Sequence, residues 1–297
     1  MTPRERGFLL LSSHMGDPGR KVLTPAQLRT LFQRVTSDDP KRDDRDVLPE
    51  DLLALGFDRT FAERVVQLLS EEERLDWYLQ KGRAAGCVPI TRISAGYPKI
   101  LRHRMGADSP GCLWCKGDLS LLETSGIALV GSRLLQEPNK LFAAEAGRQA
   151  ALQGFTLISG NAAGADRMAQ DSCLYWGGRV ISIVADNLQQ HSCKNHLLYV
   201  SEHGFDLPFT APRALSRNRI IHSLGHLTLV AQSSYKTGGT WSGTVTNLSK
   251  QYSPVFCFDD GSPAAEELAQ RGAGRITLHG LKDLSLLQPE EQNFFGQ

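Results

Sequence analysis

Two hydrophobic patterns divide the chain. Over the first hundred residues, apolar side chains recur every three or four positions, as expected for amphipathic helices. In the stretch TPAQLRTLFQRV, Thr24 and Pro25 stand where an N-cap and a first helical residue belong. Two further stretches, 48–57 and 58–86, predict one short and one longer helix. We therefore expect a small helical N-terminal domain over residues 1–90.

From about Gly126 onward, short apolar runs alternate with amphipathic segments. Runs that are apolar on both faces and separated by helices indicate a parallel sheet covered on both sides. The pattern predicts an α/β fold, a Rossmann-like doubly wound parallel sheet. We assign it to residues 91–297 with a core at 126–279. The expected strands lie at 126–131, 155–159, 179–185, 227–232, 254–258 and 275–279, and helical patterns lie between most of them, as at 140–154 and 263–272.

The balance of charged residues limits the kinds of molecule that the protein is expected to bind. Lysine and arginine total 33 against 32 acidic residues, a formal net charge of +1, so a general nucleic-acid coat is excluded and any such binding needs a local patch. No apolar run approaches the roughly 18 residues of a membrane helix. The run from Phe8 to Leu11 is too short for a signal peptide, so we expect a cytoplasmic protein. The mixed-charge stretch from Ser37 to Asp46 predicts a solvated loop.

The six cysteines do not form a recognisable metal-binding pattern. Only Cys112 and Cys115, in CLWC, have a suggestive spacing, and a zinc ribbon would need a second close pair. The turn-like residues that follow also argue against a redox motif, which needs a helix directly after it. We expect reduced thiols and no metal site.

Glycines, hydroxyls and basic residues follow several of the expected strands. The carboxyl ends of parallel strands meet at one sheet edge, where ligands of such folds bind. Backbone N–H groups at a helix start, glycines that allow close approach, and cationic side chains together predict a phosphate site. The candidates in these loops are Gly131, Ser132, Arg133, Ser159, Gly160, Asn161, Gly164, Arg217, Asn218, Arg219, Lys236, Thr237, Gly238, Gly239 and Thr240.

The order of these motifs resembles the DprA/Smf family of DNA-processing proteins. The stretches that carry the resemblance are YPKILRHRMGADSPGCLWCKGDLSLL, ALVGSR, LISGNAAGADRMAQ, GGRVISIVADNL, SRNRII and TGGTWSGT. The resemblance implies a Rossmann-like core, binding of single-stranded DNA, loading of a RecA-type recombinase and a homodimer formed through the core. It implies neither covalent chemistry nor a cofactor, and it assigns the DNA phosphates to the loops at 131–133, 159–160, 217–219 and 236–240.

The sequence departs from the family pattern in ways that suit a divergent branch. Ala165 stands where members usually have isoleucine, and Gln170 where they have histidine. The loop around Trp241 is longer than in typical members. Many members also end in a winged helix, whereas little chain follows Leu278, so we expect that domain to be absent.

Individual residues leave alternatives open. Trp241 is interpreted either as a surface on which a base stacks or as a core aromatic residue at the start of a helix, and the second interpretation is preferred. Arg217 and Arg219 are two positions apart, so in mid-helix they point to different sides, and one of them would form a structural ion pair instead. Asp166 is expected to hold its turn in shape rather than to act as a catalytic acid.

Two alternative functions remain beside DNA binding. A nucleotide-binding sensor in a bacterial defence or toxin–antitoxin module would suit the near-neutral charge. A phosphoribohydrolase would need a glutamate after the TGGT loop, where Val245 and Thr246 stand instead, so we expect no enzyme activity.

Overall fold

The N-terminal third of the chain is helical. A computed structural model describes residues 1–37 and 46–287; most of the expected Ser37–Asp46 loop lies outside them. The segment at 58–86, expected as one helix, forms two. Glu71 lies at the turn between them and pairs with Arg20 and Arg74. The helices are α1 (Pro3–Ser12), α2 (Pro25–Ser37), α3 (Pro49–Ala54), α4 (Arg59–Leu69) and α5 (Glu72–Ala84).

Nine strands among the described residues form a single sheet, in the order β1-β2-β6-β5-β4-β3-β7-β8-β9. The seven strands from β6 to β9 in this order pair in parallel with their neighbours. β1 and β2 form an antiparallel edge beside β6, which the hydrophobic pattern did not predict. The strands are β1 (Val88–Thr91), β2 (Cys112–Gly117), β3 (Gly126–Val130), β4 (Thr156–Ser159), β5 (Arg179–Ile183), β6 (Leu197–Ser201), β7 (Thr228–Val230), β8 (Val255–Phe258) and β9 (Gly274–Ile276).

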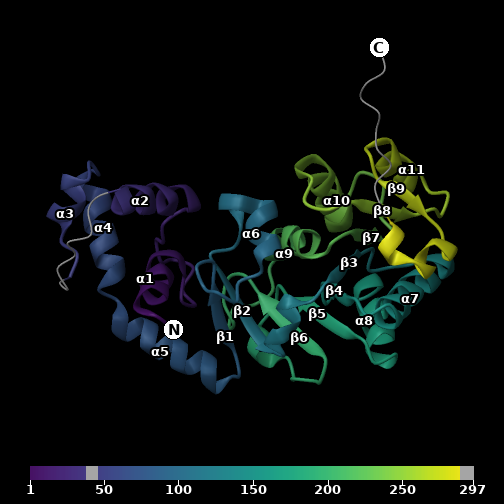
Figure 1. The fold of residues 1–297 in the computed structure, drawn as a ribbon, viewed down its shortest axis with the longest axis horizontal. Helices are drawn as coiled ribbons and strands as arrows, with labels where there is room; N and C mark the ends of the chain where they lie inside the picture. Colours follow the sequence, from purple (N-terminus) through teal and green to yellow (C-terminus); the bar gives the residue numbers. More distant parts are fainter. Residues whose placement is uncertain (38–45, 288–297) are drawn as a thin grey trace, which may run out of the picture.

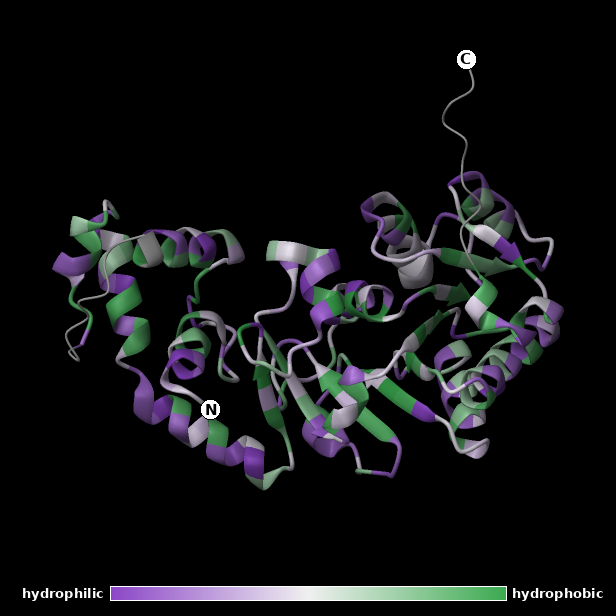
Figure 2. Cartoon of the chain, in the orientation of Figure 1, coloured by the Kyte–Doolittle hydropathy of each residue, from purple (hydrophilic) through white to green (hydrophobic). Residues whose placement is uncertain are grey.

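Helices cover both faces of the sheet, as Figure 1 shows. α6, α9, α10 and α11 pack on one face, and α7 and α8 pack on the other together with the chain near Leu281. Hydrophobic residues are concentrated in the strands of the sheet (Figure 2). The bounds are α6 (Lys99–Met105), α7 (Glu137–Leu152), α8 (Ala165–Tyr175), α9 (Ala211–Leu224), α10 (Gly238–Lys250) and α11 (Pro263–Gln270).

An aromatic cluster joins the helical region to the sheet. Tyr78 of α5 packs against Trp114 of β2 and Phe205, with ring centroids 5.2 and 4.6 Å apart. The Tyr78 hydroxyl donates to Asp206 at 2.9 Å, and Lys81 pairs with the same carboxylate at 2.8 Å. A separate core of leucines and valines lies between α2, α3 and α4. The helical region is thus anchored through α1 and α5, while its remaining helices have their own core. The domain boundary near residue 90 stays a prediction.

Cys112 and Cys115 both lie buried in β2. Burial raises the pKa of each thiol, which keeps both protonated at neutral pH. Among the described residues, no group of three or more histidine, cysteine or acidic side chains is placed to hold a metal ion. In the same part of the chain, no helix is both long enough and apolar enough to span a bilayer.

Candidate nucleic-acid interface

The topology places a cavity where the sheet order reverses. From β3 the chain proceeds to β4, β5 and β6 on one side, then crosses to β7, β8 and β9 on the other. The loops after β3 and β7 diverge at such a switch point and leave a crevice at the carboxyl ends of the strands. Here the crevice is a cavity of about 770 Å³, which we call the switch cavity. It is lined by Gly131–Arg133 after β3, by Lys236–Thr240 after β7, and by one face of α9.

The N-terminus of α10 opens into the cavity. Thr237 precedes the helix without a side-chain capping bond, so the first backbone N–H groups lack that partner. Gly238 has φ of +83°, and a Cβ there would meet nothing within 4 Å, which leaves room for a ligand. The Asn218 side chain donates to the Gly239 carbonyl at 3.1 Å and fixes the loop. This combination of helix start and open glycine favours a phosphate group.

Two exposed cations stand at the mouth of the cavity. Arg133 and Lys236 form no ion pair with any described residue. The Lys236 ammonium lies 4.8 Å from the ring centroid of Tyr235, in the same loop. Both side chains are therefore free to reach an anion bound at the α10 N-terminus.

A family model for DNA recombination-mediator protein A matches residues 89–280. This range includes the whole switch cavity. The chain belongs to the DprA family. It is 31% identical over 214 residues to the DNA processing protein DprA of Bacillus subtilis, covering 65% of this chain and 69% of that protein.

Two solved DprA structures have a similar fold. The Streptococcus pneumoniae DprA structure superposes with a TM-score of 0.74 at 21% identity, over 97% of this chain and 99% of that one. DNA processing protein A of Helicobacter pylori, studied for its single-stranded DNA binding mode, gives a TM-score of 0.54 at 23% identity, over 66% and 92% of the two chains. These likenesses confirm the Rossmann-like fold predicted from the sequence.

The second glycine-rich loop of this DprA-family core contributes less to the cavity than expected. Ser159 is fully buried, and its hydroxyl donates to the Leu129 carbonyl at 2.9 Å, so it is not available to a phosphate. Gly160 is also buried, and a Cβ there would overlap the Arg217 guanidinium and the Asp166 carboxylate. Asn161 does not line the cavity. The absence of side chains in this loop therefore accommodates an internal ion pair, not a ligand.

Two other glycines allow the loops to pack against each other. A Cβ on Gly164, whose φ is +86°, would overlap the carbonyl oxygens of Ser132 and Arg133. A Cβ on Gly131 would overlap the Ala165 side chain. The Ala165 N–H donates to the Ser132 carbonyl at 3.2 Å and completes this contact. Gly131 lines the cavity, but its lack of a side chain is needed for the packing of β3 on α8.

Arg217 and Asp166 form a buried pair at the back of the cavity. Arg217 Nη2 lies 3.7 Å from Asp166 Oδ2, and Arg217 Nη1 donates to the Ile183 carbonyl at 2.6 Å. Burial raises the pKa of Asp166, although the nearby guanidinium opposes this, and burial lowers the pKa of Arg217. Asp166 also accepts from the Ala162 N–H at 3.4 Å and so orients its turn. Arg217 therefore contributes to the shape and the positive charge of the cavity at once.

Arg219 and Trp241 do not belong to the cavity. Arg219 points to the other side of α9, where it binds the Glu202 carboxylate and the Asp108 carbonyl, because residues two apart on a helix face different ways. Trp241 is 8% exposed and packs in the core beneath α10. With its ring faces covered by neighbouring side chains, it offers no platform for a base.

Two exposed aromatic residues were missed by the sequence analysis. Phe209 lines the cavity and is 53% exposed, and Tyr235 is 47% exposed in the loop beside Lys236. Phe209 precedes α9, which starts at Ala211 with Thr210 as its N-cap and Pro212 in its first turn. This Thr-x-Pro signal was present in the sequence. Had the helix start been recognised, its spacing would have put Ala214, Asn218 and Ile221 on one face.

Proposed function

We propose that this DprA-family chain binds single-stranded DNA for DNA processing, recombination or uptake, and that the switch cavity holds the phosphates. One observation carries the proposal: the uncapped α10 N-terminus opens into a cavity whose mouth holds the unpaired cations Arg133 and Lys236. A phosphodiester satisfies the backbone donors and the cations together. The family match and the DNA-binding relative from H. pylori support the same ligand.

The exposed aromatic residues give the proposal a reason to prefer single strands. Bases of a single strand are free to stack, and stacking on an aromatic ring contributes about 1–3 kcal/mol per base regardless of sequence. Phe209 lines the cavity and Tyr235 lies in the loop beside Lys236, and each side chain is about half exposed. In a duplex the base faces are already covered by their neighbours, so these rings would contribute little to duplex binding.

We further propose that the cavity binds without catalysing a reaction. Asp166, the acid at its back, is paired with Arg217 and contacts the backbone of its own turn. A general acid or base must instead reach the substrate by a hydrogen bond. Val245 and Thr246 follow the Gly238–Thr240 turn where a hydrolase of this general fold would need a carboxylate.

We also propose that the protein acts with a RecA-type recombinase, forms a homodimer and is located in the cytoplasm. The family description as a recombination mediator supports a recombinase partner.

Apolar side chains on α7 and α8 are exposed. Among them, Leu141, Leu152 and Tyr175 are 62%, 53% and 83% exposed. A second copy of the chain would cover this face of the core. Analytical ultracentrifugation of the wild type and of a Leu152→Glu variant distinguishes a dimer from a monomer.

Replacing the cations at the mouth tests the DNA site. We expect Arg133→Gln and Lys236→Gln each to weaken binding of single-stranded oligonucleotides about tenfold, which corresponds to about 1.4 kcal/mol. Each change should also lower the slope of log affinity against log salt by about 0.7, the value for one phosphate contact on a single strand. Fluorescence anisotropy over a salt series measures both quantities.

The control for this series is Lys250→Gln. Lys250 is exposed at the opposite end of α10, away from the cavity. Its replacement removes one positive charge, as the replacements of Arg133 and Lys236 do. We expect its affinity and salt slope to match those of the wild type. If all three variants lose affinity equally, the loss reflects the net charge of the protein and not a site at the cavity. If Arg133→Gln and Lys236→Gln bind like the wild type, the DNA binds elsewhere.

A further inference from the structure

A second basic cavity lies between the helical region and the sheet. Two adjoining cavities of about 410 and 490 Å³ share Arg92, which follows β1. One wall comes from the helical region and its α1–α2 loop, and the other from α6, β2 and the segment after β6. We call this the basic groove. Its cations are Arg4, Lys21, Arg64, Arg92 and Arg102, with Arg20 set deeper behind them.

Five cations of the groove have no acidic partner among the residues that the structure describes. None of the five cations forms an ion pair with a described residue. Arg92 donates to the Ala107 and Ser109 carbonyls, at 2.8 and 3.4 Å, and its pKa is lowered by burial and further by Arg102 and Arg29 nearby. Carbonyl oxygens satisfy the guanidinium donors but leave the positive charge in place. The groove therefore concentrates positive potential between low-dielectric walls.

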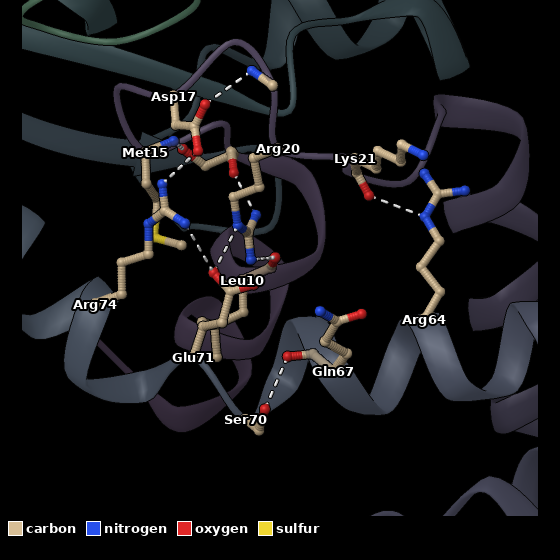
Figure 3. A network of polar contacts seen from close by, with 12 residues as sticks. Leu10, Met15, Asp17, Arg20, Lys21, Arg64, Gln67, Ser70, Glu71 and Arg74 are labelled. Atoms are coloured by element: carbon tan, nitrogen blue, oxygen red, sulfur yellow. Dashed lines mark hydrogen bonds and ion pairs between the residues drawn. The ribbon is translucent and has the colours of Figure 1, made fainter.

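Figure 3 shows how the wall on the helical side is held. The Arg20 guanidinium, 6% exposed, donates to the Leu10 and Ser13 carbonyls at 2.6 and 2.5 Å and pairs with Glu71 at 2.9 Å. Arg64 of α4 donates to the Lys21 carbonyl at 2.9 Å from its Nε. These bonds fix the α1–α2 loop, so the exposed Lys21 is presented from a rigid segment.

Glu202, an acidic residue that lines the groove, already has hydrogen-bonding partners. Glu202 binds Arg219 of α9 and accepts from the Ser216 hydroxyl at 2.9 Å. Its charge is thus compensated from the α9 side and does not oppose an anion in the groove. Nearby, the His14 Nδ1 atom is buried and has no hydrogen-bond partner in the described part of the chain, which leaves a polar atom of the groove unsatisfied.

The groove and the switch cavity lie on two sides of α9. Ala214, Arg217 and Asn218 of this helix face the switch cavity. Arg219 faces Glu202 and Asp108, and Glu202 and Ser109 line the groove. A chain of phosphates that leaves the switch cavity across α9 therefore comes next to the groove.

We propose that the basic groove is a second binding surface for the phosphodiester backbone of single-stranded DNA. The inference rests on the proposed function of the switch cavity and extends it across α9. Unpaired arginine and lysine side chains along a channel suit a polyanion with evenly spaced charges, because each phosphate releases counterions when it is neutralised. The helical region thereby contributes directly to DNA binding.

The test compares a short and a long oligonucleotide. The triple variant Arg4→Gln, Lys21→Gln, Arg102→Gln removes three groove charges that form no ion pair within residues 1–37 and 46–287. A single strand of about 6 nucleotides fits one site, whereas one of about 30 spans both. We expect the triple variant to bind the 30-mer about tenfold more weakly, with a salt slope lower by about 2, and to bind the 6-mer like the wild type.

The matched control removes the same net charge elsewhere. Arg83→Gln, Lys250→Gln, Lys282→Gln lies away from both cavities, and we expect it to bind both oligonucleotides within about twofold of the wild type. Thermal unfolding establishes that both triple variants are folded. If the groove triple does not fold, Lys21→Glu, a single exposed residue, is expected to give the same length-dependent loss.

Three outcomes would overturn the groove proposal. The first is equal binding of the 30-mer by the groove triple and the control triple while Arg133→Gln remains defective; the switch cavity would then act alone. The second is a groove triple variant that binds poly-glutamate more weakly than the wild type does but binds the 30-mer with unchanged affinity. The groove would then be a site for an acidic protein. The third is failure of the wild type to bind either oligonucleotide, which would remove the proposed function first.

Discussion

Arg217→Met is expected to lower the free energy of unfolding by about 3–5 kcal/mol at pH 7, because it leaves Asp166 buried without its cation. Asp166 is 5% exposed, and burial already raises its pKa. The double variant Arg217→Met, Asp166→Asn removes both charges and should regain more than half of this loss. Urea unfolding of the two single variants and the double variant completes a double-mutant cycle.

The loss in Arg217→Met should depend on pH in a defined direction. A carboxyl group whose pKa is higher in the folded state lowers stability as pH rises above its unfolded value of about 3.8. Without Arg217 this effect grows, so the deficit should shrink toward pH 4. An exposed pair supplies the control: Arg275→Met, next to Asp259, should cost about 0.5 kcal/mol or less. A cost of that size at Arg217, or a double variant no better than the single, would contradict the assigned pair.

His222 is expected to make the protein about 3 kcal/mol less stable at pH 4 than at pH 7, relative to a variant without this histidine. Burial lowers its pKa from 6.5 to about 4. A histidine with a depressed pKa contributes stability above its unfolded pKa and loses it as the pH falls through the folded value. The loss therefore develops between pH 6.5 and 4. Unfolding curves of the wild type and His222→Asn across this range give the difference.

Burial keeps His222 neutral, and its hydrogen bonds are arranged for the neutral ring. The Ser253 N–H donates to Asn247 Oδ1 at 2.9 Å, which turns the Asn247 amide nitrogen toward His222 Nδ1 at 3.2 Å. Nδ1 is therefore an acceptor, and protonating it would oppose one donor to another in a buried site. His103→Asn, a change at an exposed histidine, serves as the control and should leave the pH dependence unaltered. An NMR titration in which His222 protonates near its ordinary pKa would refute the prediction.

The fold followed from the sequence wherever a local pattern was strong enough. The expected strands at 126–131, 155–159, 179–185, 227–232 and 254–258 correspond to β3, β4, β5, β7 and β8, since fully buried strands require continuous apolar runs. The expected strand at 275–279 overlaps β9, which begins and ends earlier in the chain. β1, β2 and β6 were not predicted. Their pairing depends on partners distant in the chain, which no local window contains.

The candidate site was predicted in outline but not in detail. Glycines and cations after β3 and β7 were expected at one sheet edge, and the structure places Arg133, Lys236 and Gly238 around one cavity. The glycine-rich loop after β4 was interpreted in the same way, yet Gly160 makes room for Arg217 and Asp166. Sequence shows that a side chain is absent and does not show which neighbour fills the space.

The sequence by itself determined most strands of the parallel core, the glycine-rich loops that follow them along the chain, and the resemblance to the DprA family, because these depend on periodicity and on motifs read along the chain. Only the tertiary structure decided which side of α9 each arginine faces, that Trp241 is buried, and that the helical region meets the sheet in a basic groove. The physical reason is that burial and charge pairing arise between residues more than a hundred positions apart, as between Lys81 and Asp206. Such contacts exist only after the sheet has brought the segments together.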